Sequence, residues 1–133
     1  MSKIVYLNSK YVNFKNAKVH VEDRGLQFGD SVYEVVAVVN YKLLDLKFHF
    51  QRLKFSLNEL DIKYKFTSTQ LTVIFKKLIY DNSIKNGIIY LQITRGVQAR
   101  EHSYRDKLKP TVIIYTQKKN FNLPNKNLKG VNV

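Results

Sequence analysis

The feature that most constrains the fold is a change of hydrophobic period near residue 46. Before it, residues 32–39 read V-Y-E-V-V-A-V-V, a β-branched run typical of a strand, and Asn40-Tyr41 is the expected hairpin turn before a return over 42–45. After it, apolar residues recur at alternating spacings of four and three, as on one helix face: Leu46, Phe50, Leu53, Leu57 and Leu60.

A second helix follows the first. Thr67 and Gln70 have the spacing of a capping box at its start. Its predicted buried face is Leu71, Ile74, Phe75, Leu78 and Ile79, and residues 82–87 end it.

Strands are predicted on both sides of the two helices. Apolar and aromatic residues nearly alternate over 3–8 and 10–21, and residues 87–96 and 111–116 are also strand-like. Turn signals at 23–25 and 29–30 and a polar loop over 97–110 separate them. Strands, two helices and strands again predict an α+β fold, a mostly antiparallel sheet with the two helices packed on one face.

Length and composition favour one domain. A chain of 133 residues can bury a core of its own, and the absence of cysteine excludes disulfides, thiolate metal sites and cysteine catalysis. No apolar run approaches the length of a membrane span, and the start M-S-K-I-V-Y-L-N lacks the apolar stretch of a secretory signal. We therefore expect a cytoplasmic protein with no membrane partner.

The formal charge of +13 raises the question of nucleic-acid binding. Only five of the 23 basic residues are arginines, and the lysines are scattered among asparagine, tyrosine and isoleucine. That mixture indicates a general compositional drift rather than a basic face, so we expect no nucleic-acid partner. The charge should still attract anionic ligands.

Two polar side chains stand out on the strand after the glycine turns. Along a strand Tyr33 shares one face with Val35, and Glu34 shares the other with valines. Tyr33 fits core packing as well as a ligand site, and Glu34 is expected near water at the strand end.

Three basic side chains could bind anions. Arg52 lies at the margin of the apolar stripe of the first helix, where an exposed arginine and an anion-binding fork are both possible readings. Arg100 and His102 are two residues apart and would project to one side of an extended segment, suited to a carboxylate, although a solvated loop gives the same pattern. His20 and His49 have no acids at ligand spacing, so no metal site is predicted.

Three segments, in this order and spacing, resemble the fold-type IV pyridoxal-phosphate aminotransferases and, within them, the D-amino-acid branch. They are E-D-R-G-L-Q-F-G-D-S-V-Y-E-V-V over 22–36, H-F-Q-R-L-K-F-S over 49–56 and Y-L-Q-I-T-R-G-V-Q-A-R-E-H over 90–102. The resemblance implies pyridoxal 5'-phosphate as cofactor, with a D-amino acid of the D-alanine type and the 2-oxo acid 2-oxoglutarate as substrates.

The resemblance also assigns roles. Tyr33 would project into the substrate site, and Arg52 would approach the cofactor phosphate. Arg100 and His102 would clamp the substrate α-carboxylate of the neighbouring subunit, which implies a homodimer. A phenol, a guanidinium fork and an imidazole are suited to a carboxylate, and an arginine is suited to a phosphate.

The resemblance covers only the N-terminal lobe of such an enzyme. Members of this family carry the Schiff-base lysine in a second domain, and no residue here matches it. Lys126 and Lys129 fall in the expected connector and are poor candidates. We therefore expect an N-terminal domain over 1–118, a connector and truncated start of the second domain over 119–133, and no activity from the chain alone. A separately encoded C-terminal half is one possible partner.

Two alternatives remain open at this point. The lobe could belong to a branched-chain amino-acid aminotransferase, although the R-x-H pair favours the D-amino-acid branch. It could also be a catalytically inert remnant that acts as a binding module.

Overall fold

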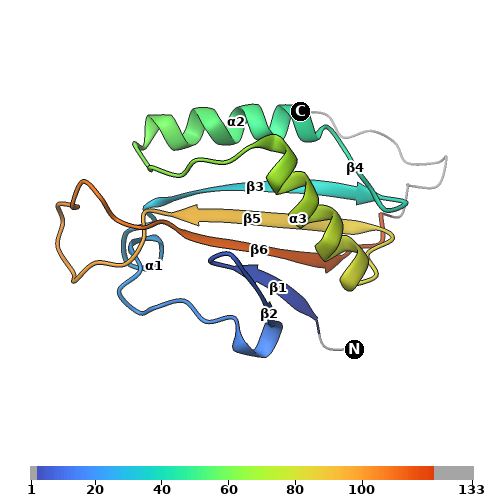
Figure 1. Ribbon diagram of the computed structural model, residues 1–133, viewed down its shortest axis with the longest axis horizontal. Coiled ribbons are helices and arrows are strands. Elements are labelled where there is room, and N and C mark those ends of the chain that lie inside the picture. Colours follow the sequence, from blue (N-terminus) through green and yellow to red (C-terminus); the bar gives the residue numbers. More distant parts are fainter. Residues whose placement is uncertain (1–2, 122–133) are drawn as a thin grey trace, which may run out of the picture.

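The computed structural model describes residues 3–121, and these form a six-stranded antiparallel sheet with helices on one face (Figure 1). The strand order is β2-β1-β6-β5-β3-β4. The strands are β1 (Ile4–Leu7), β2 (Lys10–Asn13), β3 (Ser31–Val39), β4 (Lys42–Leu43), β5 (Gly87–Thr94) and β6 (Thr111–Lys118). The predicted α+β class and its mostly antiparallel sheet are confirmed.

Helices α2 (Leu46–Glu59) and α3 (Ser68–Asp81) cover one face of this sheet. The first packs along β3, and the second lies over β1 and β6. Their apolar stripes meet the strands in one core, whose fully buried members include Val36, Val38, Leu53, Leu71, Phe75, Leu78, Ile89, Leu91, Ile93 and Ile114. The two predicted helices therefore form the second layer of the fold.

Local signals account for the start of α3 and for the hairpin. Thr67 caps α3, and its side chain and that of Gln70 exchange hydrogen bonds with each other's backbone as a complete capping box. Asn40 and Tyr41 both have positive φ, the conformation of a two-residue hairpin turn between β3 and β4.

Two predictions about the N-terminal third are wrong in detail. β2 ends at Asn13, whose side chain caps a 3-10 helix, η1 (Phe14–Asn16), so no strand extends to residue 21. The two turn signals flank a short helix, α1 (Arg24–Phe28), which Asp23 caps at its start and Gly29 ends with φ 65°. Glycine is favoured there because it has no Cβ to clash in the left-handed region.

The alternation of β3 separates two chemical environments. Val32, Glu34, Val36 and Val38 point toward the helices and are buried, whereas Tyr33 and Val35 point to the opposite face, which no helix covers in residues 3–121. We call this opposite side the open face of the sheet.

The predicted connector over 119–133 lies almost wholly outside the described residues, and so do Lys126 and Lys129. No helix between residues 3 and 121 combines the length and apolar character needed to cross a membrane.

Candidate active site

A buried carboxylate on β3 holds two side chains of α2. Oε1 and Oε2 of Glu34 accept hydrogen bonds from Nε and Nη2 of Arg52 at 2.7 and 2.6 Å. Oε2 also lies 2.7 Å from Nδ1 of His49, and because an ionised carboxylate can only accept, the proton belongs on Nδ1. The bidentate fork fixes the orientation of the Arg52 guanidinium.

The electrostatics of this cluster keep Glu34 charged. Burial acts to raise the pKa of the Glu34 carboxyl, but the hydrogen bonds from Arg52 and His49 outweigh burial and lower that pKa. The Glu34 side chain is 3% exposed, whereas that of Arg52 is 65% exposed. A shallow depression of about 420 Å³, lined by Asp45, Phe48, His49 and Arg52, lies beside the guanidinium. A fixed and accessible arginine beside a depression is suited to an anion.

The position of Glu34 corrects the expectation that it lies near water. Its face of β3 is the one that α2 covers, so the carboxylate is enclosed between strand and helix. The sequence signal that could have indicated a buried Glu34 is the spacing of His49 and Arg52. These two residues are one turn apart, and both lie off the apolar stripe of their helix.

Tyr33 lies on the open face, not in the core. It is 63% exposed and stacks on Tyr90 of β5 with ring centroids 5.9 Å apart. Its hydroxyl has no hydrogen-bond partner among residues 3–121, so the phenol is available to a ligand. The core-packing reading of Tyr33 is therefore wrong, and its role in a substrate site stays a prediction.

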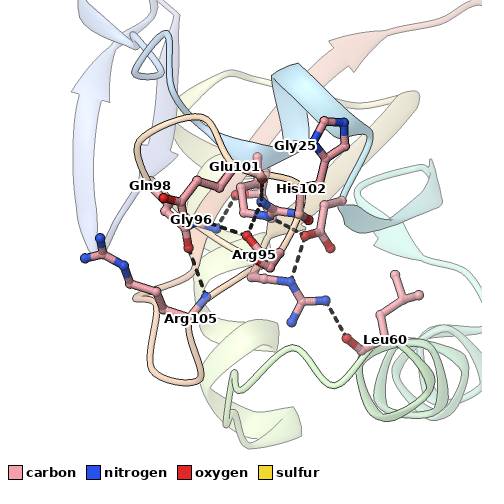
Figure 2. Close-up of polar contacts among 12 residues, drawn as sticks. Gly25, Leu60, Arg95, Gly96, Gln98, Glu101, His102 and Arg105 are labelled. Carbon is pink, nitrogen blue, oxygen red and sulfur yellow. Dashed lines mark hydrogen bonds and ion pairs between the residues drawn. The ribbon is translucent and has the colours of Figure 1, made fainter.

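Arg100 and His102 come together on the loop between β5 and β6. Both are exposed, and both contact the ring of Phe28 in α1: the guanidinium carbon of Arg100 lies 4.7 Å from its centroid, and the His102 ring lies 5.9 Å away. Figure 2 shows that polar contacts hold this loop against the end of the sheet. A guanidinium and an imidazole thus lie against the same ring, and both are donor groups suited to a carboxylate.

These groups do not form one site within a single chain. In residues 3–121, no hydrogen bond, ion pair or ring contact joins Tyr33 or Arg52 to the Arg100–His102 pair. The register Ser31↔Thr94 nevertheless places the loop and the start of β3 at the same end of the sheet. No three His, Asp or Glu side chains of the described part gather as metal ligands.

Comparison with known sequences identifies the family. A model described as amino-transferase class IV matches residues 31–132. The D-alanine aminotransferase of Staphylococcus aureus (strain MSSA476) is 37% identical over 130 residues, covering 96% of this chain and 45% of that protein. The D-alanine aminotransferase of Listeria monocytogenes serotype 4b (strain F2365) is 41% identical over 103 residues, covering 77% and 36%. The chain therefore spans less than half the length of these relatives.

Solved structures agree on the fold. The branched-chain amino acid aminotransferase of Escherichia coli superposes with a TM-score of 0.84 at 21% identity, covering 96% of this chain and 43% of that one. The 4-amino-4-deoxychorismate lyase of Pseudomonas aeruginosa superposes with a TM-score of 0.69 at 23% identity, covering 87% and 40%. With residues 31–132 matched, the chain belongs to the class IV aminotransferase family.

Proposed function

We propose that the chain is the N-terminal lobe of a pyridoxal-phosphate-dependent aminotransferase that transfers the amino group of a D-amino acid of the D-alanine type to 2-oxoglutarate. The observation that carries the proposal is the gathering of exposed Arg100 and His102 on Phe28, in a chain whose relatives include D-alanine aminotransferases at 37–41% identity. The branched-chain alternative rests on the fold alone, because those solved structures are 19–22% identical to this chain.

The residues present fit the phosphate of the cofactor. Arg52 would bind it. Glu34 fixes the Nε–Nη2 edge of the guanidinium, Nη1 has no hydrogen-bond partner in the part of the chain described, and the Arg52 side chain lines the depression. When bound, pyridoxal 5'-phosphate supplies the electron-withdrawing ring that makes removal of the substrate α-proton possible. In this proposal the lysine that binds it comes from a second lobe, continuous with this chain or separately encoded.

The carboxylate of the substrate would be bound by three groups. Tyr33 would donate its phenolic hydrogen from one subunit, and Arg100 and His102 would donate from the neighbouring subunit of a homodimer. Orientation of the substrate by such a clamp supplies a large part of the rate in two-substrate chemistry. The inert-remnant alternative predicts the same fold without turnover.

A coupled assay separates these functions. The gene product, expressed in its genetic context, is supplied with 2-oxoglutarate and either D-alanine, L-alanine or L-leucine, and the oxo acid released is measured. We expect pyruvate from D-alanine alone. Turnover of L-leucine would establish the branched-chain alternative, and no turnover with any of the three would establish the inert remnant.

Binding of the phosphate group is tested independently. In a titration with pyridoxal 5'-phosphate followed by phosphorus NMR, Arg52→Gln should weaken binding about tenfold. Arg105→Gln removes an exposed guanidinium elsewhere and should leave binding unchanged. Equal affinity in both variants would remove Arg52 from the proposed site.

A further inference from the structure

Arg24, the first residue of α1, is a buried arginine that holds the loop carrying Arg100 and His102. It is 5% exposed. Its Nη1 donates to the carbonyl oxygens of Glu101 at 2.8 Å and Ser103 at 3.3 Å, and its Nη2 donates to that of His102 at 3.2 Å. One guanidinium thus binds three successive carbonyls, which fixes the backbone path of residues 101–103.

Asp30 fixes Arg24 in turn. Its Oδ2 accepts from Nε of Arg24 at 2.9 Å and from Nε of Arg95 at 2.7 Å. Burial acts to raise the pKa of Asp30, but the hydrogen bonds from Arg95 and Arg24 outweigh burial and lower it, so the carboxylate stays charged between them. Arg95 also donates to the carbonyls of Leu60 and Asp61, at 2.6 and 3.1 Å, and so ties the network to the end of α2 (Figure 2).

Phe28 stands between Arg24 and the exposed pair. The Arg24 guanidinium carbon lies 4.5 Å from the Phe28 centroid, and the Arg100 guanidinium carbon lies 4.7 Å from it. His102 contacts the same ring at 5.9 Å. A guanidinium on an aromatic face is attracted to it, so the ring restricts the side chains while Arg24 restricts their backbone.

The short helix can occupy this place only with a glycine at its second position. A Cβ on Gly25 would lie 2.4 Å from Cγ2 of Thr94, the last residue of β5. This close approach brings α1 against the end of the sheet, where Arg24 reaches the loop and Phe28 reaches Arg100. The R-G-L-Q-F-G-D segment is therefore a support for the loop.

We propose that Arg24 and Phe28 are positioning residues for the substrate carboxylate: Arg24 sets the backbone of residues 101–103, and Phe28 sets the side chains of Arg100 and His102. The inference rests on the carboxylate role given to that pair above. Both residues act through others, so neither touches the substrate. A site held this way is preorganised, and preorganised donors bind an anion without paying for their own ordering on binding.

The two residues predict different defects, which separates positioning from a merely structural role. In Arg24→Lys the charge remains but the three carbonyl bonds are lost, so nitrogen-15 order parameters of residues 101–103 should fall from about 0.85 to below about 0.6. In Phe28→Leu the carbonyl bonds remain, so the order parameters should stay near the wild-type values while carboxylate affinity falls.

The affinity is measured on the chain by titrating D-lactate, an α-hydroxy carboxylate, and following the ring protons of His102 by NMR. We expect dissociation constants about tenfold higher for Phe28→Leu and for Arg24→Lys. Phe55→Leu and Arg105→Lys are the matched controls, because both positions are exposed and neither side chain has a ring or cation-π contact with Phe28 among residues 3–121; both should bind as wild type does.

Wild-type affinity and order in both variants would overturn the proposal. If the wild-type chain binds no D-lactate, the carboxylate role of the pair fails, and the positioning role is judged alone. The positioning role is then supported if Arg24→Lys lowers the order parameters of residues 101–103 or if Phe28→Leu removes the ring-current shift that Phe28 causes on the His102 signals. It is refuted if neither change occurs. If Arg24→Lys does not fold by circular dichroism, the Phe28→Leu measurements decide.

Discussion

Replacement of Glu34 by glutamine tests the cluster that orients Arg52. The substitution preserves volume and removes the charge that accepts from Arg52 and His49. Glutamine also replaces one acceptor oxygen by an amide N–H₂ group, which cannot accept from the Arg52 guanidinium. The Arg52 side chain is 65% exposed, so in the variant its guanidinium hydrogen-bonds to water instead. The loss of stability therefore comes from the buried side chain at position 34.

The magnitude follows from the burial of Glu34, whose side chain is 3% exposed. A hydrogen bond to a charged group contributes about 1.5–3 kcal/mol, and an unsatisfied buried polar group costs about 1–3 kcal/mol. Because these effects overlap at one residue, we expect Glu34→Gln to lower the free energy of unfolding by about 2–4 kcal/mol at pH 7. At this chain length the melting temperature should fall by roughly 6–20 °C.

The loss should depend on pH with a defined sign. The folded pKa of Glu34 is lowered, so its stabilisation is fully present above the unfolded value of about 4.3 and is lost as pH falls through the folded pKa. Urea unfolding followed by circular dichroism should give a constant difference between wild type and Glu34→Gln over about pH 6–8. The difference should shrink below about pH 4.

The control is Glu59→Gln, at an exposed position near the end of α2. It should change stability by less than about 0.5 kcal/mol. Glu34→Gln as stable as wild type at pH 7, or a difference that persists undiminished in acid, would refute the claim that an ionised Glu34 stabilises the cluster.

Three further substitutions test the supports of the loop and of α3. Gly96→Ala would place a Cβ 2.1 Å from the carbonyl oxygen of Lys109 at φ 114°, so loop closure should fail, visible as lost loop order by NMR. Asp30→Asn leaves the buried guanidinium groups of Arg24 and Arg95 without their anion. It should lower the free energy of unfolding by about 3–5 kcal/mol at pH 7, measured by urea unfolding. The difference should shrink in acid, because the folded pKa of Asp30 is lowered and its stabilisation is lost as pH falls through that pKa. Thr67→Ala removes the α3 cap and should cost about 1 kcal/mol in the same assay. Thr72→Ala, a half-buried threonine inside α3 that caps no helix end, is the control and should cost less.

The helices and the hairpin could be predicted because their determinants are local. Apolar spacing, the Thr67–Gln70 capping box and the Asn40-Tyr41 turn each lie within a few residues of what they specify. α1 could not be predicted, because five residues show no helical period, and its stability comes from contacts of Arg24 with a loop 77 to 79 residues away.

The environment of Glu34 is likewise set by residues distant in the sequence. Valines occur on both faces of β3, so the alternation separates two faces without showing which one the helices cover. Arg52 lies 18 residues beyond Glu34 in the sequence, and only the packing of α2 on β3 brings them together. The role of Arg52 came from the family resemblance, whereas its anchor came only from the structure.

The opposite directions of Tyr33 and Glu34 restrict where one ligand can meet both Tyr33 and Arg52. They are consecutive in β3, so Tyr33 lies on the open face and Arg52, held by Glu34, lies on the helix side. β4 pairs only with Val38 and Val39, which leaves the first part of that edge of β3 without a strand partner among residues 3–121. A ligand that contacts both side chains can therefore pass over this unpaired edge. Pyridoxal 5'-phosphate should accordingly shift the backbone amide signals of residues 31–35 together with the Nε–H signal of Arg52, whereas a shift of the Arg52 signal alone would confine the ligand to the helix side.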